Sequence, residues 1–230
     1  MAHGQRNIVL VDPRQPMSYT SAQSGDNYRN WWPHPVMTAF TNDSIDELER
    51  LAHDTGNVFN MTRGGYVLAS RKHSEAANAI RGAAIAARFP WLSKEIQSVI
   101  HIERGGDISG QQLGAWMLER MRERGVTLLR GAVTAIDKDK QFALEIDQTR
   151  TLHAERLVIA AGPHANRIAN MLGEGLPVDN VFQQKVAFED RLGAIPRYMP
   201  FSFVRDPKTL PWGEEERALL AAAPETRWLS

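Results

Sequence analysis

Two short runs of apolar residues stand out along the chain, NIVLVD at residues 7–12 and RLVIAAG at residues 156–162. Continuous apolar runs of this length are typical of parallel strands that are buried on both faces. A third strand-like run lies at residues 125–129. We therefore predict an α/β fold of mixed α+β character, with these three segments in one sheet.

Helical spacing of apolar residues predicts helices over about residues 43–55, 74–88 and 164–172. The clearest helix begins at Ser109. Ser109 and Gln112 match a capping box, in which the side chains at these two positions bond free backbone N–H groups. Gly125 lies at the far end, where glycine commonly follows a helix.

Shorter strands are predicted from alternation and from turn residues. NVFNMTRGGYVLAS is interpreted as a hairpin with its turn at Gly64-Gly65, and GAVTAID and QFALEID as strands separated by the turn DKDK. FQQKVAFED alternates like a strand, whereas IPRYMPFSFVRDPKTLPW is interpreted as a loop.

Composition narrows the class of protein. The 230 residues include 43% hydrophobic residues, which suffices for the core of one domain or of two small interleaved ones. Lys+Arg and Asp+Glu each number 27, so the chain lacks the basic excess of a nucleic-acid binder. No apolar run approaches the roughly 20 residues that span a bilayer, so we expect no membrane span and a cytoplasmic protein. The oligomeric state stays open.

Several catalytic classes are disfavoured by the residues present. There is no cysteine, and the seven histidines show no spacing typical of zinc ligands, so we expect no metal site. Neither the G-x-S-x-G elbow of serine hydrolases nor the G-x-x-x-x-G-K-[ST] phosphate loop occurs.

A candidate nucleotide site begins at the end of the first apolar run. Asp12 stands where the acid of a Rossmann unit accepts hydrogen bonds from ribose hydroxyls, although an Asp before Pro is also a common way to leave a strand. The loop that follows is rich in small polar residues, whose backbone N–H groups can approach a cofactor closely. Its candidate cofactor-binding residues are Thr20, Ser21, Ser24, Gly25 and Asn27, the alternative being an ordinary solvated loop.

Candidates for chemistry lie directly after this loop. Arg29 can hold a pyrophosphate or a substrate carboxylate. His34 is a candidate base, ring neighbour or covalent flavin attachment point, and Trp31 and Trp32 are candidate walls for a flat ring system or plain hydrophobic anchors.

The second apolar run enters its helix through small residues. Ala160, Ala161 and Gly162 let the backbone pack against a cofactor, and the helix N-terminus favours a phosphate. The alternative is a tight strand–helix turn that needs glycine only for packing.

Taken in order, three segments resemble the FAD-dependent oxidoreductases of the D-amino-acid oxidase type, which include glycine and sarcosine oxidases. These segments are NIVLVDPRQPMSYTSAQSG, GGDISGQQLGAWMLERMRERGVTLLRGAVTAID and LHAERLVIAAGPHANRIANMLG. The resemblance implies FAD as cofactor, an adenine contact at the backbone near Val133, and a small amine or amino-acid substrate oxidised by hydride transfer to the flavin. It also implies that Arg29, Lys185 or Arg63 binds the substrate's carboxylate.

The resemblance further implies two interleaved parts. Residues 1–34 and 105–177 would form a partial, Rossmann-like FAD-binding domain, and residues 35–104 and 178–230 a partial substrate domain with a mixed sheet. The family's G-x-G-x-x-G turn and its C-terminal glycine-rich segment do not occur in the sequence, so we expect an internal fragment of a longer protein. Two alternatives remain, a non-catalytic remnant or interaction module and an NAD(P)-linked Rossmann enzyme.

Overall fold

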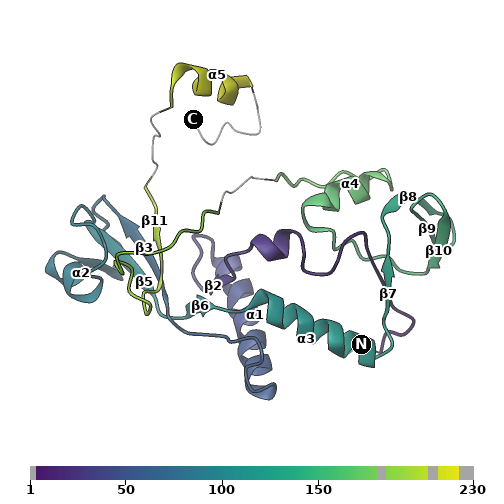
Figure 1. Cartoon of the computed structure of the whole chain (residues 1–230), viewed down its shortest axis with the longest axis horizontal. Coiled ribbons are helices and arrows are strands. Elements are labelled where there is room, and N and C mark those ends of the chain that lie inside the picture. The colour runs from purple at the N-terminus through teal and green to yellow at the C-terminus, as the bar shows by residue number, and fades with distance from the viewer. Residues whose placement is uncertain (1–3, 181–184, 207–211, 223–230) are drawn as a thin grey trace. The chain divides into compact units, whose positions relative to one another are not determined.

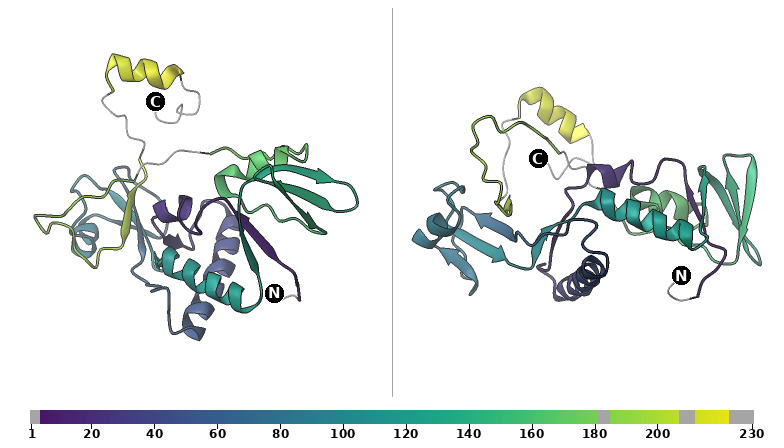
Figure 2. Two further views of the ribbon diagram at one scale, coloured as in Figure 1. Left: turned by 45° about the vertical axis from the view of Figure 1, so that its right-hand side comes forward. Right: turned by 60° about the horizontal axis from the view of Figure 1, so that its bottom comes forward.

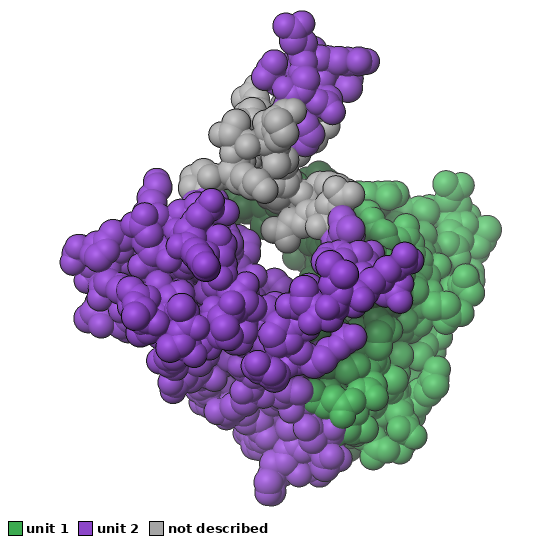
Figure 3. All heavy atoms as spheres, turned by 60° about the vertical axis from the view of Figure 1, so that its left-hand side comes forward, with its two compact units in different colours: residues 1–26, 58–60, 109–182 green, residues 27–57, 61–108, 183–230 purple. Residues whose placement is uncertain are grey.

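The computed structural model describes residues 4–180, 185–206 and 212–222 (Figure 1). Its internal contacts divide the chain into two compact units, coloured separately in Figure 3. Unit 1 comprises residues 1–26, 58–60 and 109–182, and unit 2 comprises residues 27–57, 61–108 and 183–230. Each unit is assembled from segments distant in sequence. The assignment of one part to the flavin and the other to the substrate stays a prediction.

Unit 1 combines a parallel strand pair with a small antiparallel sheet. Its elements are β1 (Val9–Asp12), η1 (Thr20–Gln23), α3 (Gly110–Glu123), β7 (Thr127–Arg130), β8 (Val133–Lys138), β9 (Phe142–Ile146), β10 (Arg150–Ala154), η2 (Gly162–His164) and α4 (Ala165–Asn170). β1 pairs in parallel with β7, which brings Asp12 opposite Arg130. β8, β9 and β10 form an antiparallel sheet in the order β10-β9-β8 (Figure 2).

One hydrophobic cluster holds unit 1 together. Its buried members, Ile136, Leu144 and Ile146, belong to β8 and β9. Val11 from β1 and Ile168 from α4 pack against them. Val11 of the first apolar run therefore contributes to this core, but burial alternates along β1 and Leu10 is 37% exposed, so the prediction of a strand buried on both faces is wrong.

Unit 2 is built on a mixed sheet. Its elements are β2 (Asn27–Arg29), α1 (Pro35–Asp54), β3 (Tyr66–Ser70), β4 (Ala79–Arg81), α2 (Ala83–Arg88), β5 (Ser98–Ile102), β6 (Gly105–Asp107), β11 (Phe201–Val204) and α5 (Glu214–Ala222). The sheet has the order β11-β3-β5-β4, with β11 parallel to β3 and the other pairs antiparallel. β2 and β6 form a separate antiparallel pair.

Alternate residues of the central strands face opposite sides of this sheet, as the two-residue period of a strand requires. Val67, Ala69 and Val99 pack with Ile85 and Phe89, at α2 and its C-terminus. The opposite face carries four other buried side chains, against which Trp31 packs; these are Tyr66, Leu68, Ile100 and Ile102. Both faces of the central strands are therefore covered in part by apolar groups.

Helix α3 begins and ends where the sequence predicts. The Ser109 hydroxyl accepts the N–H of Gln112 at 3.3 Å, and Gly125 after the helix has φ 75°. The Gln112 side chain accepts instead from the amide of Asn60, at 2.7 Å. The prediction of this helix is confirmed. Of the two bonds of the capping box, the one accepted by Ser109 is present.

The prediction of a buried strand at residues 156–162 is wrong. Residues 156–160 form neither helix nor strand and pair with no strand in the described part of the chain, and Val158 is 84% exposed. An apolar run becomes a sheet strand only where a neighbour supplies N–H and C=O partners. Leu157 alone of this run packs against the cluster of unit 1.

Two predictions around β3 and β4 are also wrong. Residues 57–65 form no hairpin arm, because the N–H groups of Thr62 and Gly65 donate to the carbonyls of Asp107 and Gly105. The helix expected over residues 74–88 is reduced to α2. Before it, Ala79–Arg81 pairs with β5, and Gly82 has φ 58°, outside the helical range.

Other boundaries differ from the sequence pattern. α1 starts at Pro35 rather than near residue 43, because Pro35 occupies its first turn and the Nδ1 atom of His34 accepts the N–H of Val36 at 3.3 Å. The loop expected after residue 195 contains β11, and α5 lies beyond it. Residues 185–190 form no strand, and the rest of the predicted strand FQQKVAFED lies outside the described residues.

Candidate functional site

Asp12, the acid at the end of β1, is exposed, and one of its carboxylate oxygens accepts a hydrogen bond. One oxygen of Asp12, Oδ1, accepts the backbone N–H of Arg14 at 2.8 Å, which turns the chain out of the strand. The backbone carbonyl of Asp12 accepts the N–H of Gly131 beyond β7. Parallel pairing therefore places a carboxylate at the C-terminal end of the strand, the position from which such an acid binds ribose.

The polar loop after β1 is fastened to helix α3. The Asp26 carboxylate accepts the N–H of Gly110 at 2.9 Å, and the side-chain amide of Gln111 donates to the carbonyl of Met17 at 3.1 Å. A Cβ at Gly114 would lie 2.5 Å from the sulfur of Met17, so glycine allows the loop to approach the helix closely. Since Asp26 already occupies the helix N-terminus, a phosphate would compete with it there.

A cavity of about 370 Å³ lies between this loop and α3. Three of the predicted cofactor-binding residues, Thr20, Ser21 and Ser24, line it. Met17, Leu113 and Met117 supply apolar wall. The volume falls at the lower end of the range for small-molecule pockets, and a few hydroxyls on an apolar wall are typical of such sites.

Aromatic stacking joins the loop to the turn at residues 162–164. The rings of Tyr19 and His164 lie 5.6 Å apart between centroids, with their planes 9° from parallel. The guanidinium carbon of Arg14 lies 3.8 Å from the centroid of the Tyr19 ring. The structure thus brings the loop near Asp12 to the turn containing Gly162, through side chains that the sequence did not single out.

Most of the other predicted cofactor-binding residues also belong to unit 1. Ala160 is exposed, Gly162 has φ 53° with nothing within 4 Å of a built Cβ, and Val133 opens β8 beside the hydrophobic cluster. Gly25 is exposed. Asn27 lies in unit 2, where its side chain donates to the carboxylate of Asp107.

Arg29 occupies an aromatic setting in unit 2. Its guanidinium carbon lies 4.4 Å from the centroid of the Trp32 ring and 4.8 Å from that of Tyr66. Its Nε atom is buried without a hydrogen-bond partner in the described structure. Gly105 pairs with Arg29 across β2 and β6, and a Cβ there would lie 3.2 Å from Cβ of Tyr66. A guanidinium that contacts two aromatic rings and has an unpaired Nε can accept an anion.

Burial raises the pKa of the Tyr66 hydroxyl, and the charge of Arg29 opposes that shift. Arg63 is committed elsewhere, since it forms an ion pair with Glu49. Lys185 is exposed. His34 serves as the cap of α1, which engages its Nδ1 atom.

Comparison with known proteins shows the family of the chain. A family model described as FAD dependent oxidoreductase matches residues 1–212. The chain belongs to this family. The resemblance found in the sequence is confirmed, and the family uses FAD, for which the exposed acid of Asp12, the hydroxyl-lined cavity and the open backbone at Gly162 are chemically suited. No curated protein sequence matches the chain.

Solved structures share the fold at low sequence identity. Glycine oxidase from Geobacillus kaustophilus is 16% identical with a TM-score of 0.63, covering 73% of this chain and 52% of its own. L-proline dehydrogenase from P. horikoshii is 14% identical with a TM-score of 0.63, covering 73% and 49%. Iminodiacetate oxidase from Chelativorans sp. BNC1 is 20% identical with a TM-score of 0.59, covering 75% and 53%. This chain therefore spans about half the length of these structures, and the mixed α/β fold class is confirmed.

The described residues contain neither a membrane-spanning helix nor a cluster of metal ligands. No helix there combines the length and the apolar character needed to cross a membrane. Across the same residues, no three side chains of His, Cys, Asp or Glu gather in a way that would hold a metal ion.

Proposed function

We propose that the chain takes part in the FAD-dependent oxidation of an amine or amino acid. The family supplies the redox class, because a bound flavin accepts the hydride from the substrate. Glycine, proline and iminodiacetate, the compounds in the names of the three structural relatives, each carry an amine nitrogen and a carboxylate. We extend this substrate class to the present chain.

The proposed substrate class rests on one observation, the lack of a hydrogen-bond partner at Nε of Arg29. Among the described residues no carboxylate pairs with Arg29, and its Nε is buried without a hydrogen-bond partner, so its guanidinium is suited to bind a substrate carboxylate. Trp32 and Tyr66 restrict its orientation, so little rotational freedom is lost on binding. Arg29 therefore binds and orients the substrate, and Arg63, already paired, is assigned a structural role.

The chain's own residues also hold the cofactor in this proposal. Asp12 accepts hydrogen bonds from the ribose. The hydroxyls of Thr20, Ser21 and Ser24, which line the cavity beside α3, contact the cofactor. The small side chains of Ala160 and Ala161, followed by Gly162, leave the backbone open to the cofactor. No residue is assigned as a base, since hydride transfer from an amine carbon requires orientation above all.

The test is anaerobic reduction of FAD by amines in the presence of the full chain. We expect flavin absorbance to bleach with glycine, proline or iminodiacetate. Arg29→Met should raise the substrate concentration that gives half-maximal bleaching by about 10- to 100-fold. Arg191→Met is the matched control, because Arg191 is an exposed arginine of the same unit. If no amine bleaches FAD that is demonstrably bound, the non-catalytic alternative replaces this proposal. Equal effects of the two substitutions would remove Arg29 from it.

A further inference from the structure

A second pocket, of about 280 Å³, lies on the mixed sheet of unit 2. Leu68 and Ser70 of β3 line it together with Ser98 and Ile100 of β5. These residues lie on one face of the sheet, since they alternate along each strand and pair across it. The turn after β3 and the end of β11 complete the lining, with Lys72, His73, Ser74, Arg205 and Asp206.

The basic side chains of this pocket outnumber its acidic ones. Lys72, His73 and Arg205 face a single carboxylate, Asp206. Both oxygens of Asp206 are already used, because Oδ1 accepts the hydroxyl of Ser70 and Oδ2 the N–H of Arg71, each at 2.6 Å. These bonds also hold the pKa of Asp206 below its ordinary value. Asp206 thus fixes the turn after β3.

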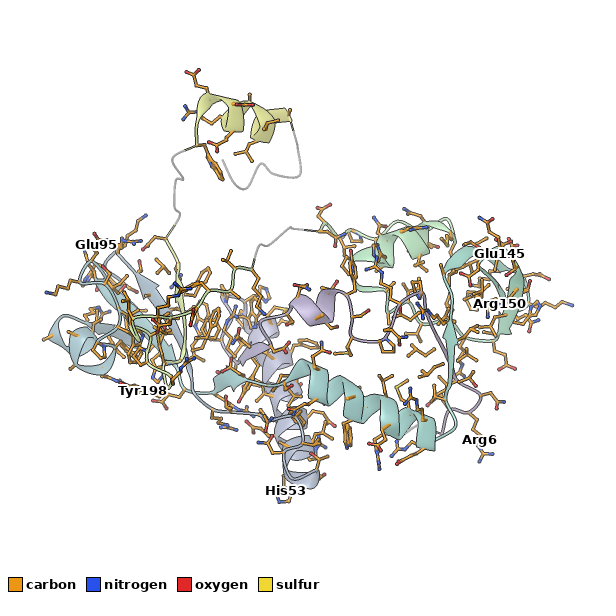
Figure 4. All side chains as sticks on the ribbon, in the orientation of Figure 1. Arg6, His53, Glu95, Glu145, Arg150 and Tyr198 are labelled. Atoms are coloured by element: carbon orange, nitrogen blue, oxygen red, sulfur yellow. The ribbon has the colours of Figure 1, made fainter. Side chains whose placement is uncertain are left out.

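Two of the cations have no ionic partner. Among the described residues, neither Lys72 nor Arg205 forms an ion pair, whereas neighbouring Arg71 pairs with Glu95 at 2.9 Å (Glu95 is labelled in Figure 4) and His73 pairs with Glu75. The guanidinium carbon of Arg205 lies 5.6 Å from the centroid of the Trp31 ring. Lys72 and Arg205 thus give this pocket an excess of positive charge over its one carboxylate, Asp206, and such an excess favours an anionic ligand.

The backbone that carries these cations is fixed. The hydroxyl of Ser98, which is 2% exposed, donates to the carbonyl of Lys72 at 2.7 Å, and the N–H of Lys72 donates to the Ser70 hydroxyl at 3.0 Å. The N–H of Arg205 donates to the carbonyl of Ala69 at 2.9 Å and so extends the pairing of β11 with β3. Little reorganisation of the main chain is needed for both side chains to contact one ligand.

We propose that this pocket binds a small oxyanion, a phosphate or a carboxylate, held by Lys72 and Arg205. The pocket volume leaves ample room for such an ion, and guanidinium and ammonium groups bind such oxygens well. The proposal does not rest on the amine oxidation, because Lys72 and Arg205 have no role in it, although Leu68 and Ile100 share a buried cluster with Tyr66.

The test is isothermal titration calorimetry of the full chain at constant ionic strength, with inorganic phosphate in one arm and acetate in the other. We expect one anion to bind per chain, and the arm with the higher affinity identifies the oxyanion. Lys72→Gln and Arg205→Gln should each weaken binding by about tenfold, since each removes one charge-assisted bond.

Lys94→Gln and Arg191→Gln are the matched controls, because they make the same charge changes at other exposed positions of unit 2. These controls should leave the affinity within about twofold of the wild type. Saturable binding in neither arm, or equal weakening by all four substitutions, would overturn the proposal. Circular dichroism of each variant distinguishes a lost site from a lost fold.

Discussion

The rings of Tyr19 and His164 stack with their planes 9° from parallel, although 145 positions separate the two residues in sequence. The contact joins the loop after β1 to the turn that opens η2. The stack therefore joins two segments that carry predicted FAD contacts.

We predict that His164→Ala lowers the free energy of unfolding by about 0.5–1 kcal/mol, because it removes one exposed aromatic pair. Urea denaturation measures this change. His164→Phe keeps a ring at this position and should retain most of the stability. An alanine variant as stable as the wild type would show that the stack contributes nothing to the loop's position.

Gly106 is required by close packing rather than by its backbone angles. A Cβ at Gly106 would lie 2.1 Å from the carbonyl oxygen of Thr62, and main-chain atoms cannot move aside as a flexible side chain can. We predict that Gly106→Ala destabilises the protein by about 2–3 kcal/mol, as overpacking does. Gly64→Ala is the matched control, since nothing lies within 4 Å of a Cβ there. Thermal unfolding of the two variants compares them, and similar melting temperatures would contradict this account.

The stability of unit 2 should depend on the protonation of His101. Burial lowers the pKa of His101 from its ordinary value of 6.5, the nearby charge of Arg88 lowers it further, and Glu103 opposes both. Below pH 6.5 the unfolded chain therefore binds more protons than the folded one, and the free energy of unfolding falls as the pH falls towards the pKa of the folded state.

We predict that His101→Gln flattens this dependence, measured by urea denaturation between about pH 7.5 and pH 5.5. The exposed His53 provides the control, and His53→Gln should keep the wild-type slope. Identical slopes for wild type and His101→Gln would exclude His101 as the titrating group.

The parts of the fold that depend on local signals could be predicted from the sequence. α3 follows from Ser109, Gln112 and Gly125, because a cap and a terminating glycine act within one helical turn. β1 and its parallel pairing follow from the apolar run that ends at Asp12. The family resemblance rests on the same local segments and on their order.

The elements that depend on distant partners could not be predicted in this way. The run at residues 156–162 has the composition of a strand, but pairing depends on a neighbour that no local pattern specifies. Ala79–Arg81 lies in an alanine-rich stretch, yet hydrogen bonds to β5 outweigh its helical propensity. The Tyr19–His164 stack and the basic pocket are formed by residues far apart in sequence, which explains why neither was found from motifs.

The most direct test of the central claim, that unit 1 carries FAD contacts, is a fluorescence-quenching titration of FAD with the full chain and with Asp12→Asn. Asp12→Asn removes the charged acceptor at the end of β1, while Asp139→Asn makes the same change at an exposed turn of the same unit. We predict saturable quenching that Asp12→Asn weakens by about tenfold and Asp139→Asn leaves unchanged. Quenching that never saturates, or three superimposable curves, would contradict the assignment of this site.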